Sequence, residues 1–366
     1  MSVPFFTLNR QNKEIKSDLL SAIERCLDGG SFILGKSVGA LEKHMADFIG
    51  VKYAVGLASG TDALHLALLA LGIKEGDEVI TSPFTFVATA EAISYCGARP
   101  VFADIEPNTF NLDVPKIKLS TSTKAILPVH LYGQPANMKE VSDFCRSNNK
   151  YLIEDCAQAI GAEFNGKKVG SFGDIGCFSY FPTKNLGCFG DGGIITTNNS
   201  ELANQVKVLR GHGSSKTYHY DIIGYNSRLD ALQAEILLVR FKHLASWDKK
   251  RKQNASLYQK DLKGLEEIVL PYVDPKSSHV FNQFTIRAKD RDKLFDHLRR
   301  HGIGCMVYYP LCLHLQKAFA YLGYKKGDFP ESERAQEEVL SLPIFPELEE
   351  SEIAEACEAI RKFYKK

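Results

Sequence analysis

Residues 53–71 read YAVGLASGTDALHLALLAL: a short apolar run, a Ser-Gly-Thr-Asp turn and a longer apolar run. The run 53–58 has the length of a buried strand, and 63–71 is typical of a buried helix that Gly72 closes. A strand followed directly by a buried helix is the repeating unit of α/β proteins. The stretch therefore predicts an α/β fold with a helix-covered sheet.

The same alternation continues to residue 197. Further strands are expected at 78–82, 100–104, 125–130, 151–155 and 194–197, and helices at 86–95 and 138–147. This order favours a large domain with a mostly parallel sheet flanked by helices. Because such sheets bind ligands beyond the carboxyl ends of their strands, functional residues are expected just after strands.

The pattern changes after about residue 245. A helix at 231–238 precedes this point; beyond it, helices are expected at 247–262, 290–301 and 350–364, and strands at 281–287 and 306–309. A length of 366 residues fits about two domains. We therefore predict a large domain at 1–244 and a smaller C-terminal α+β domain at 245–366.

Composition narrows the choice of partners. The 45 Lys and Arg residues nearly balance the 44 Asp and Glu residues, so nucleic acid is not an expected partner. The charged run 248–252 is therefore interpreted as a solvated helix face rather than a nucleic-acid patch. No apolar run approaches the roughly 20 residues of a membrane span, and residues 1–10 do not resemble a secretory signal. Nine cysteines without a C-x-x-C motif suit reduced thiols. We expect a cytoplasmic protein without a membrane partner.

Two segments just after strands offer polar groups. Ser59-Gly60-Thr61 combines hydroxyls, a glycine and helix N–H groups, which suit a phosphate, although an ordinary N-cap would look the same. Asp155 ends the strand 151–155, where a carboxylate can hold a proton on a cofactor's ring nitrogen, bind a metal or ribose hydroxyl, or simply cap a turn. Gln158 would face the same way if a turn begins there.

A third segment, residues 177–193, reads CFSYFPTKNLGCFGDGG and places Lys184 between aromatic residues and a glycine-rich turn. A desolvated lysine there would have a lowered pKa and could act as a Schiff-base nucleophile, whereas most lysines are solvated surface charges. A fourth segment, 224–230, opens a helix and could be no more than a helix start. A phosphate site, a strand-end Asp and a poised Lys are together the parts that pyridoxal 5'-phosphate requires.

On these motifs, which run along nearly the whole chain, the sequence resembles the DegT-type (DegT/DnrJ/EryC/StrS) nucleotide-sugar aminotransferases, pyridoxal-phosphate enzymes of fold type I. The resemblance implies that Lys184 holds the cofactor covalently and is the catalytic base, and that Asp155 pairs with its ring nitrogen. It implies no metal. The other implied cofactor contacts are Gly60, Thr61 and Ser179 at the phosphate, Phe86 stacked on the ring, Gln158 near the ring oxygen, and Asn226 donated by a neighbouring subunit.

The resemblance also implies a reaction. A homodimer with shared active sites would move an amino group from L-glutamate to a keto nucleotide sugar by a ping-pong mechanism, through the pyridoxamine 5'-phosphate form, in lipopolysaccharide or polysaccharide biosynthesis. Residues 181–193 favour a 3-keto sugar linked to UDP or dTDP over a 4-keto sugar, and Tyr308, Tyr309 and His314 are candidate substrate contacts. A sugar dehydratase, in which histidine replaces the lysine, and a non-catalytic regulatory or sugar-binding protein remain as alternatives.

Overall fold

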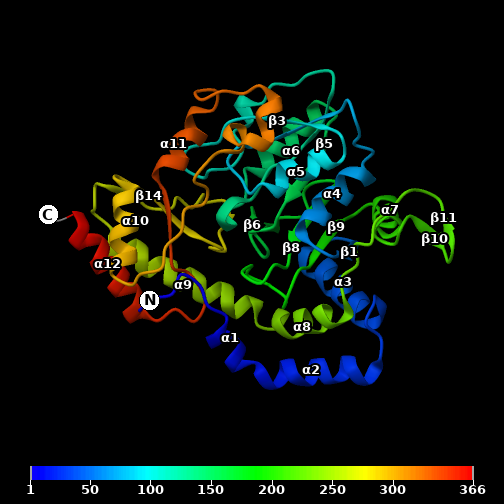
Figure 1. Ribbon diagram of the computed structural model, residues 1–366, viewed down its shortest axis with the longest axis horizontal. Helices are drawn as coiled ribbons and strands as arrows, with labels where there is room; N and C mark the ends of the chain where they lie inside the picture. The colour runs from blue at the N-terminus through cyan, green and yellow to red at the C-terminus, as the bar shows by residue number, and fades with distance from the viewer. Residues whose placement is uncertain (1, 365–366) are drawn as a thin grey trace.

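A seven-stranded sheet forms the centre of the protein in the computed structural model, which describes residues 2–364 (Figure 1). In spatial order its strands are β1 (Tyr53–Leu57), β9 (Gly193–Thr197), β8 (Ile175–Ser179), β5 (Tyr151–Asp155), β4 (Thr123–Ile126), β2 (Glu78–Thr81) and β3 (Arg99–Phe102). Neighbours from β8 to β3 are parallel, and β9 is antiparallel to both of its neighbours. The predicted mostly parallel α/β sheet is confirmed.

Helices cover both faces of this sheet. Alternate strand residues face two apolar cores, since side chains along a strand point to opposite faces. One core contains α4 (Gly60–Ala70), α5 (Ala88–Tyr95) and α7 (Ser200–Arg210). On the other face lie α3 (Gly35–Ile49), α6 (Met138–Ser147) and α8 (Ala231–Phe241). Among the parallel strands, β2 leads into α5 and β4 into α6, while β5 and β8 end in loops at the same edge of the sheet. Ligands of such sheets bind at this carboxyl edge.

The N-terminal segment forms helices that were not predicted. They are α1 (Asn9–Glu14), α2 (Lys16–Gly29) and α3. Ile15, Leu19 and Ala22 pack against Ile236 and Val239, so α2 lies along α8 on the outside of the molecule (Figure 1). Helix α2 is thus held by burial of one apolar face.

A second, smaller sheet lies in the C-terminal part of the chain. Its elements are β12 (Ile268–Val269), β14 (Phe284–Ala288) and β15 (Val339–Leu342), with α9 (Leu244–Leu262), α10 (Arg291–Arg300) and α12 (Glu350–Tyr364) packed around it. Val3 joins this core, whereas Leu313, Phe319 and Phe329 return to contact Ala90 and Phe102 beside the large sheet. The division of the chain at residue 244 stays a prediction.

Short elements complete the fold. They are the strands β6 (Glu163–Phe164), β7 (Lys167–Lys168), β10 (Ser214–Lys216), β11 (His219–Tyr220) and β13 (Ser277–Ser278), the 3-10 helices at Val114–Lys116, Leu131–Gly133, Leu313–Leu315 and Lys317–Leu322, and α11 (Pro330–Glu338). Among residues 2–364, no helix has both the length and the apolar character that a membrane span needs.

The predicted strand at 306–309 is wrong. Only Met306 pairs with a neighbouring strand, exchanging two backbone hydrogen bonds with Ser341. The chain then turns away through a cis peptide bond between Tyr308 and Tyr309, and the carbonyl of Tyr308 accepts a hydrogen bond from the Tyr132 hydroxyl. Aromatic packing therefore determines this segment rather than a strand ladder. The other predicted elements are present, with ends shifted by a few residues.

Candidate active site

Asp155 lies at the carboxyl end of β5, in the middle of the large sheet. Its Oδ2 accepts a hydrogen bond of 2.9 Å from the Thr89 hydroxyl, and its Oδ1 accepts one of 3.1 Å from the Ala157 N–H. Burial raises the pKa of this carboxyl group, while these hydrogen bonds and the charge of Lys184 act in the opposite direction. The side chain is thus a buried, oriented carboxylate with acceptor capacity left on each oxygen.

Lys184 lies in the turn that connects β8 to β9 and is half-buried. Burial lowers the pKa of its amine from 10.5 to about 8, and the negative charge of Asp155 partly offsets this shift. Over the described part of the chain, no carboxylate forms an ion pair with the Lys184 ammonium group. The side chain therefore combines a free amine with a lowered pKa, the property of a lysine that attacks carbonyl groups.

The start of α4 and the end of β8 form a cradle for an anion. Ser59 caps the helix by accepting the Asp62 N–H, so the backbone N–H groups of Gly60 and Thr61, in the first turn, have no acceptor within the helix. A Cβ atom on Gly60 would lie only 2.6 Å from the Cβ of Ser179, so glycine is needed for this approach. N–H groups at a helix N-terminus beside a serine hydroxyl suit a phosphate.

Gln158 connects the site to the aromatic segment that follows Met306. Its Oε1 accepts the Tyr132 N–H at 2.7 Å, and its Nε2 donates to the Tyr309 hydroxyl at 3.1 Å. Since an amide carries two N–H groups, one remains for a ligand. The Tyr309 ring lies 5.7 Å from the Tyr308 ring and 6.3 Å from the ring of Phe86, which is 56% exposed and open to stacking.

The remaining two predicted residues, His314 and Asn226, have different surroundings. His314 is buried, with its Nε2 3.0 Å from Glu333 and its ring 4.8 Å from that of Phe329, and burial lowers its pKa. Asn226 is exposed beside Ser227, whose hydroxyl donates to the Asp62 carboxylate at the start of α4. The structure thus brings Asn226 near the anion cradle, but leaves its side chain facing outward.

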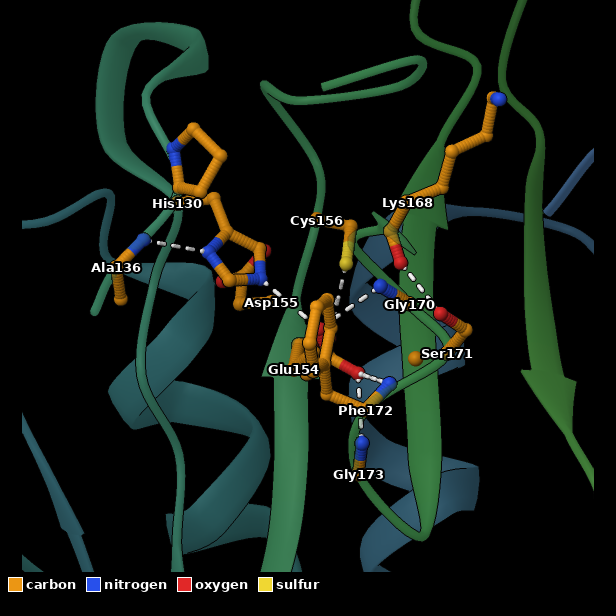
Figure 2. Close-up of polar contacts among 12 residues, drawn as sticks. His130, Ala136, Glu154, Asp155, Cys156, Lys168, Gly170, Ser171, Phe172 and Gly173 are labelled. Carbon is orange, nitrogen blue, oxygen red and sulfur yellow. Dashed lines mark hydrogen bonds and ion pairs between the residues drawn. The ribbon is translucent and has the colours of Figure 1, made fainter. Parts of the chain in front are cut away.

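Figure 2 shows a closed hydrogen-bond cluster beside Asp155. His130 Nδ1 accepts the Ala136 N–H, so its Nε2 carries the proton and donates to the Glu154 carboxylate at 3.2 Å. The same carboxylate accepts the backbone N–H groups of Gly170, Phe172 and Gly173. His130, Glu154 and Cys156 lie close enough together to hold a metal, but the imidazole and carboxylate atoms are already occupied by hydrogen bonds. The cluster anchors the end of β5.

Thr89 is a site residue that sequence reasoning missed. It lies in the first turn of α5, and its hydroxyl contacts both Asp155 and the Thr85 hydroxyl, which is 3.0 Å away. The only signal for it was a pair of threonines four residues apart at a helix start, a spacing that puts both on one face. That pattern is too common to indicate a site without the tertiary contact to Asp155.

A free lysine amine, a buried carboxylate and an anion cradle at one edge of this sheet define a pyridoxal-phosphate-dependent aminotransferase of fold type I. The family model of the DegT/DnrJ/EryC1/StrS aminotransferase family matches residues 13–361. The chain belongs to this family, whose cofactor is pyridoxal 5'-phosphate. The open cradle at Gly60 and the unpaired Lys184 amine fit that cofactor.

Relatives match the chain over its full length. A protein of Geobacillus stearothermophilus named as a pleiotropic regulatory protein is 47% identical, with 100% of this chain and 99% of the relative covered. A UDP-N-acetyl-3-dehydro-alpha-D-glucosamine 3-aminotransferase of Acidithiobacillus ferrooxidans is also 47% identical, with 99% and 98% covered. The X-ray structure of DesV from S. venezuelae, in complex with a ketimine intermediate, has a TM-score of 0.97 and 39% identity, with 100% and 99% covered.

Proposed function

We propose that this aminotransferase moves an amino group from L-glutamate to a 3-keto sugar linked to UDP or dTDP, in ping-pong order. The observation that carries the proposal is the free Lys184 amine, with a pKa of about 8, acting beside the buried Asp155 carboxylate. The relative that is named for a 3-dehydro UDP-sugar supports the choice of acceptor. The ping-pong order would follow because the cofactor carries the amino group between two half-reactions, so both substrates use the same site, with Lys184, in turn.

The bound cofactor supplies the aldehyde that accepts the amino group and a ring that withdraws electrons from the reacting carbon. Lys184 would hold the cofactor through its amine and would move a proton to and from the substrate carbon as general base and acid. Asp155 keeps the ring nitrogen protonated, and Gln158 offers its second N–H to the ring oxygen. Gly60, Thr61 and Ser179 hold the phosphate, and the exposed Phe86 ring stacks on the cofactor. Tyr308, Tyr309 and His314 stay candidate substrate contacts.

The direct test incubates purified protein with glutamate and a series of 3-keto and 4-keto nucleotide sugars, followed by mass spectrometry. We expect a 3-keto sugar to exchange its carbonyl oxygen for an amine. Amination of 4-keto sugars alone would contradict the choice of acceptor, and loss of water would indicate a dehydratase. If glutamate leaves the cofactor's absorbance unchanged and no sugar reacts, the chain is a non-catalytic regulatory or sugar-binding member instead.

We also propose a homodimer with shared active sites, in the cytoplasm. The hairpin of β10 and β11 projects from the rest of the molecule (Figure 1). Tyr218, in its turn, is 86% exposed, and Ile223, in the loop that follows β11, is 90% exposed. Exposed apolar clusters of this kind mark interaction surfaces, and the outward-facing Asn226 follows directly. A second copy covering the hairpin would receive Asn226 at its phosphate cradle. Nine free cysteines, most of them buried, support a reducing compartment.

The loop that follows the hairpin provides a test of the dimer. We expect Ile223→Glu to raise the dimer dissociation constant by at least about tenfold, because a carboxylate would be desolvated in the interface. Light scattering over a concentration series measures this constant. Val269→Glu, at a 61% exposed site on β12, is the matched control and should leave it unchanged. An equal effect of both substitutions, or of neither, would argue against the hairpin as the interface.

A further inference from the structure

Asn185, the residue after Lys184, connects the lysine turn to distant parts of the chain. Its side chain is 5% exposed, and its Nδ2 donates to Asp248 Oδ1 and to the Val280 carbonyl, both at 3.0 Å. Its Oδ1 accepts a hydrogen bond of 2.9 Å from Asn282 Nδ2. Asp248 belongs to α9, and the other two partners lie between β13 and β14. All three partners therefore come from the C-terminal part of the chain.

The chemistry of these partners fixes the orientation of the Asn185 amide. A carboxylate and a backbone carbonyl can only accept, so the amide nitrogen must face Asp248 and Val280. The amide oxygen then faces Asn282, which must present its own nitrogen. Because the group is buried, water cannot take the place of a lost partner, and each unpaired atom would carry a desolvation cost. The amide thus has one arrangement, which sets the position of its backbone.

The partners are themselves held by the surrounding structure. Val280 donates its N–H to the Gly133 carbonyl, and Arg251, one turn along α9 from Asp248, donates to the carbonyl of Phe281. A Cβ atom on Gly133 would lie 2.9 Å from a methyl group of Val280, so the two backbones are packed closely. Asn185 is therefore attached to a fixed platform between the large sheet and α9.

The Lys184 side chain depends on this attachment, because its amine has no hydrogen-bond partner of its own among residues 2–364. The turn is tight: the Lys184 N–H donates to the Phe181 carbonyl at 2.9 Å, and a Cβ atom on Gly187 would lie 2.5 Å from the Pro182 carbonyl oxygen. A shift of the Asn185 backbone would therefore move Lys184 directly. A misplacement of about 1 Å is enough to reduce a reaction strongly.

We propose that Asn185 is a positioning residue, whose hydrogen bonds to Asp248, Val280 and Asn282 hold the Lys184 amine where it meets the cofactor aldehyde. This inference rests on the proposed function of Lys184. It assigns to the C-terminal part of the chain a role in the geometry of the cofactor lysine. Lys184 belongs to the turn between β8 and β9, but the position of its amine is fixed by contacts of Asn185 with α9 and with the segment before β14.

The first test replaces Asn185 by Leu, which has a similar size and no hydrogen-bonding groups. In protein freed of cofactor, we expect the dissociation constant for pyridoxal 5'-phosphate, measured by absorbance, to rise roughly tenfold. The pH midpoint of covalent capture should also move upward from about 8, because a displaced amine is less buried while Asp155 stays the charged group that faces it. A role in stability alone would not move this midpoint.

Asn254→Leu is the matched control. Asn254 lies on α9, the helix that carries Asp248, and is 7% exposed. Its Nδ2 donates to the Phe345 carbonyl at 2.9 Å, away from the lysine turn. This variant should lower the thermal unfolding temperature and keep the wild-type dissociation constant and pH midpoint. If Asn185→Leu behaves in the same way, the positioning role is overturned while the function of Lys184 stands.

A pair of substitutions decides the question if Asn185→Leu does not fold. Asn185→Asp places a second buried carboxylate beside Asp248, and we expect cofactor affinity to fall by more than tenfold. Adding Asp248→Asn lets the new amide nitrogen donate to the carboxylate at position 185 and should recover part of the loss, while the Val280 carbonyl stays without its donor. Absence of recovery overturns the proposal. A wild-type protein that captures no cofactor at Lys184 overturns the proposed function and this inference together.

Discussion

Lys184→Met will reduce amination of the nucleotide sugar by about 10³-fold or more, since proton transfer and covalent attachment both use this amine. Methionine fills nearly the same space as the lysine stem, so the loss is one of chemistry rather than of packing. The rate is measured as aminated sugar by mass spectrometry under saturating glutamate. Thermal unfolding of the variant should stay close to that of the wild type or rise slightly, because burial disfavours the charged amine in the folded chain.

The same substitution has a second, pH-dependent signature. With a pKa of about 8, the wild-type amine is increasingly neutral as the pH rises from 7 to 9, so covalent capture of pyridoxal phosphate should accelerate across this range. After borohydride reduction and unfolding, cofactor should stay attached to the wild type and not to Lys184→Met. Lys249→Met, on the exposed side of α9, is the control and should retain the cofactor. Attachment of the cofactor to Lys184→Met would contradict the assignment.

The site residues that could be predicted from sequence are those that belong to short local motifs. Gly60 and Thr61 begin the helix two residues after β1, and Asp155 ends β5, so local strand and turn patterns placed them at one edge of the sheet. Lys184 was identifiable because aromatic residues and glycines flank it. Because the strands before these residues lie in one sheet and end at the same edge, residues that are far apart in the sequence come together there.

Side-chain contacts between segments that are far apart in the sequence could not be predicted from local patterns. The bond between Thr89 and Asp155 spans 66 residues, and that between Asn185 and Val280 spans 95. The segment 306–309 has the short apolar and aromatic run of a strand, yet it packs among the aromatic residues around Tyr309. Nothing in the local sequence specifies such pairings, because they are determined by how separately formed elements pack. Helix α2 is different, because its buried residues Leu19, Ala22 and Cys26 recur at helical spacing, so its sequence alone indicates a helix.

The second large effect is expected for Asp155→Asn. An amide cannot carry the negative charge that keeps the cofactor's ring nitrogen protonated, so we expect amination to fall by about 10²- to 10³-fold. Both contacts of Asp155 can be kept, since the amide oxygen can accept the Ala157 N–H while the amide nitrogen donates to the Thr89 hydroxyl. Removing this charge should also lower the pKa of Lys184 below about 8, because Asp155 is the group that raises it. The pH midpoint of covalent capture reports that change independently of turnover.

Whereas Asp155→Asn should lower the rate of amination, it should raise the stability of the folded chain. Burial raises the pKa of Asp155 above its ordinary value, so the folded chain binds more protons than the unfolded chain between the two pKa values, and its stability falls as the pH rises through that interval. At pH 7 the ionised carboxylate is therefore a net cost to the protein freed of cofactor, and Asp155→Asn should raise its unfolding temperature. Asp104→Asn is the contrast. Asp104 accepts the Ser332 N–H and hydroxyl at Oδ1 and the Glu331 N–H at Oδ2, and an amide cannot accept at both positions, so this replacement should lower that temperature.

A rise in stability together with a loss of turnover would identify Asp155 as a residue kept for chemistry and not for folding. Active sites hold charges in unfavourable surroundings because those surroundings give the charge its reactivity, and the rest of the fold compensates. The buried Glu154, one residue earlier, shows the other solution, since four donors surround its carboxylate (Figure 2). If Asp155→Asn instead lowered the unfolding temperature at pH 7, Asp155 would belong with Glu154 as a structural anchor, and its pairing with a cofactor ring would lose its physical basis.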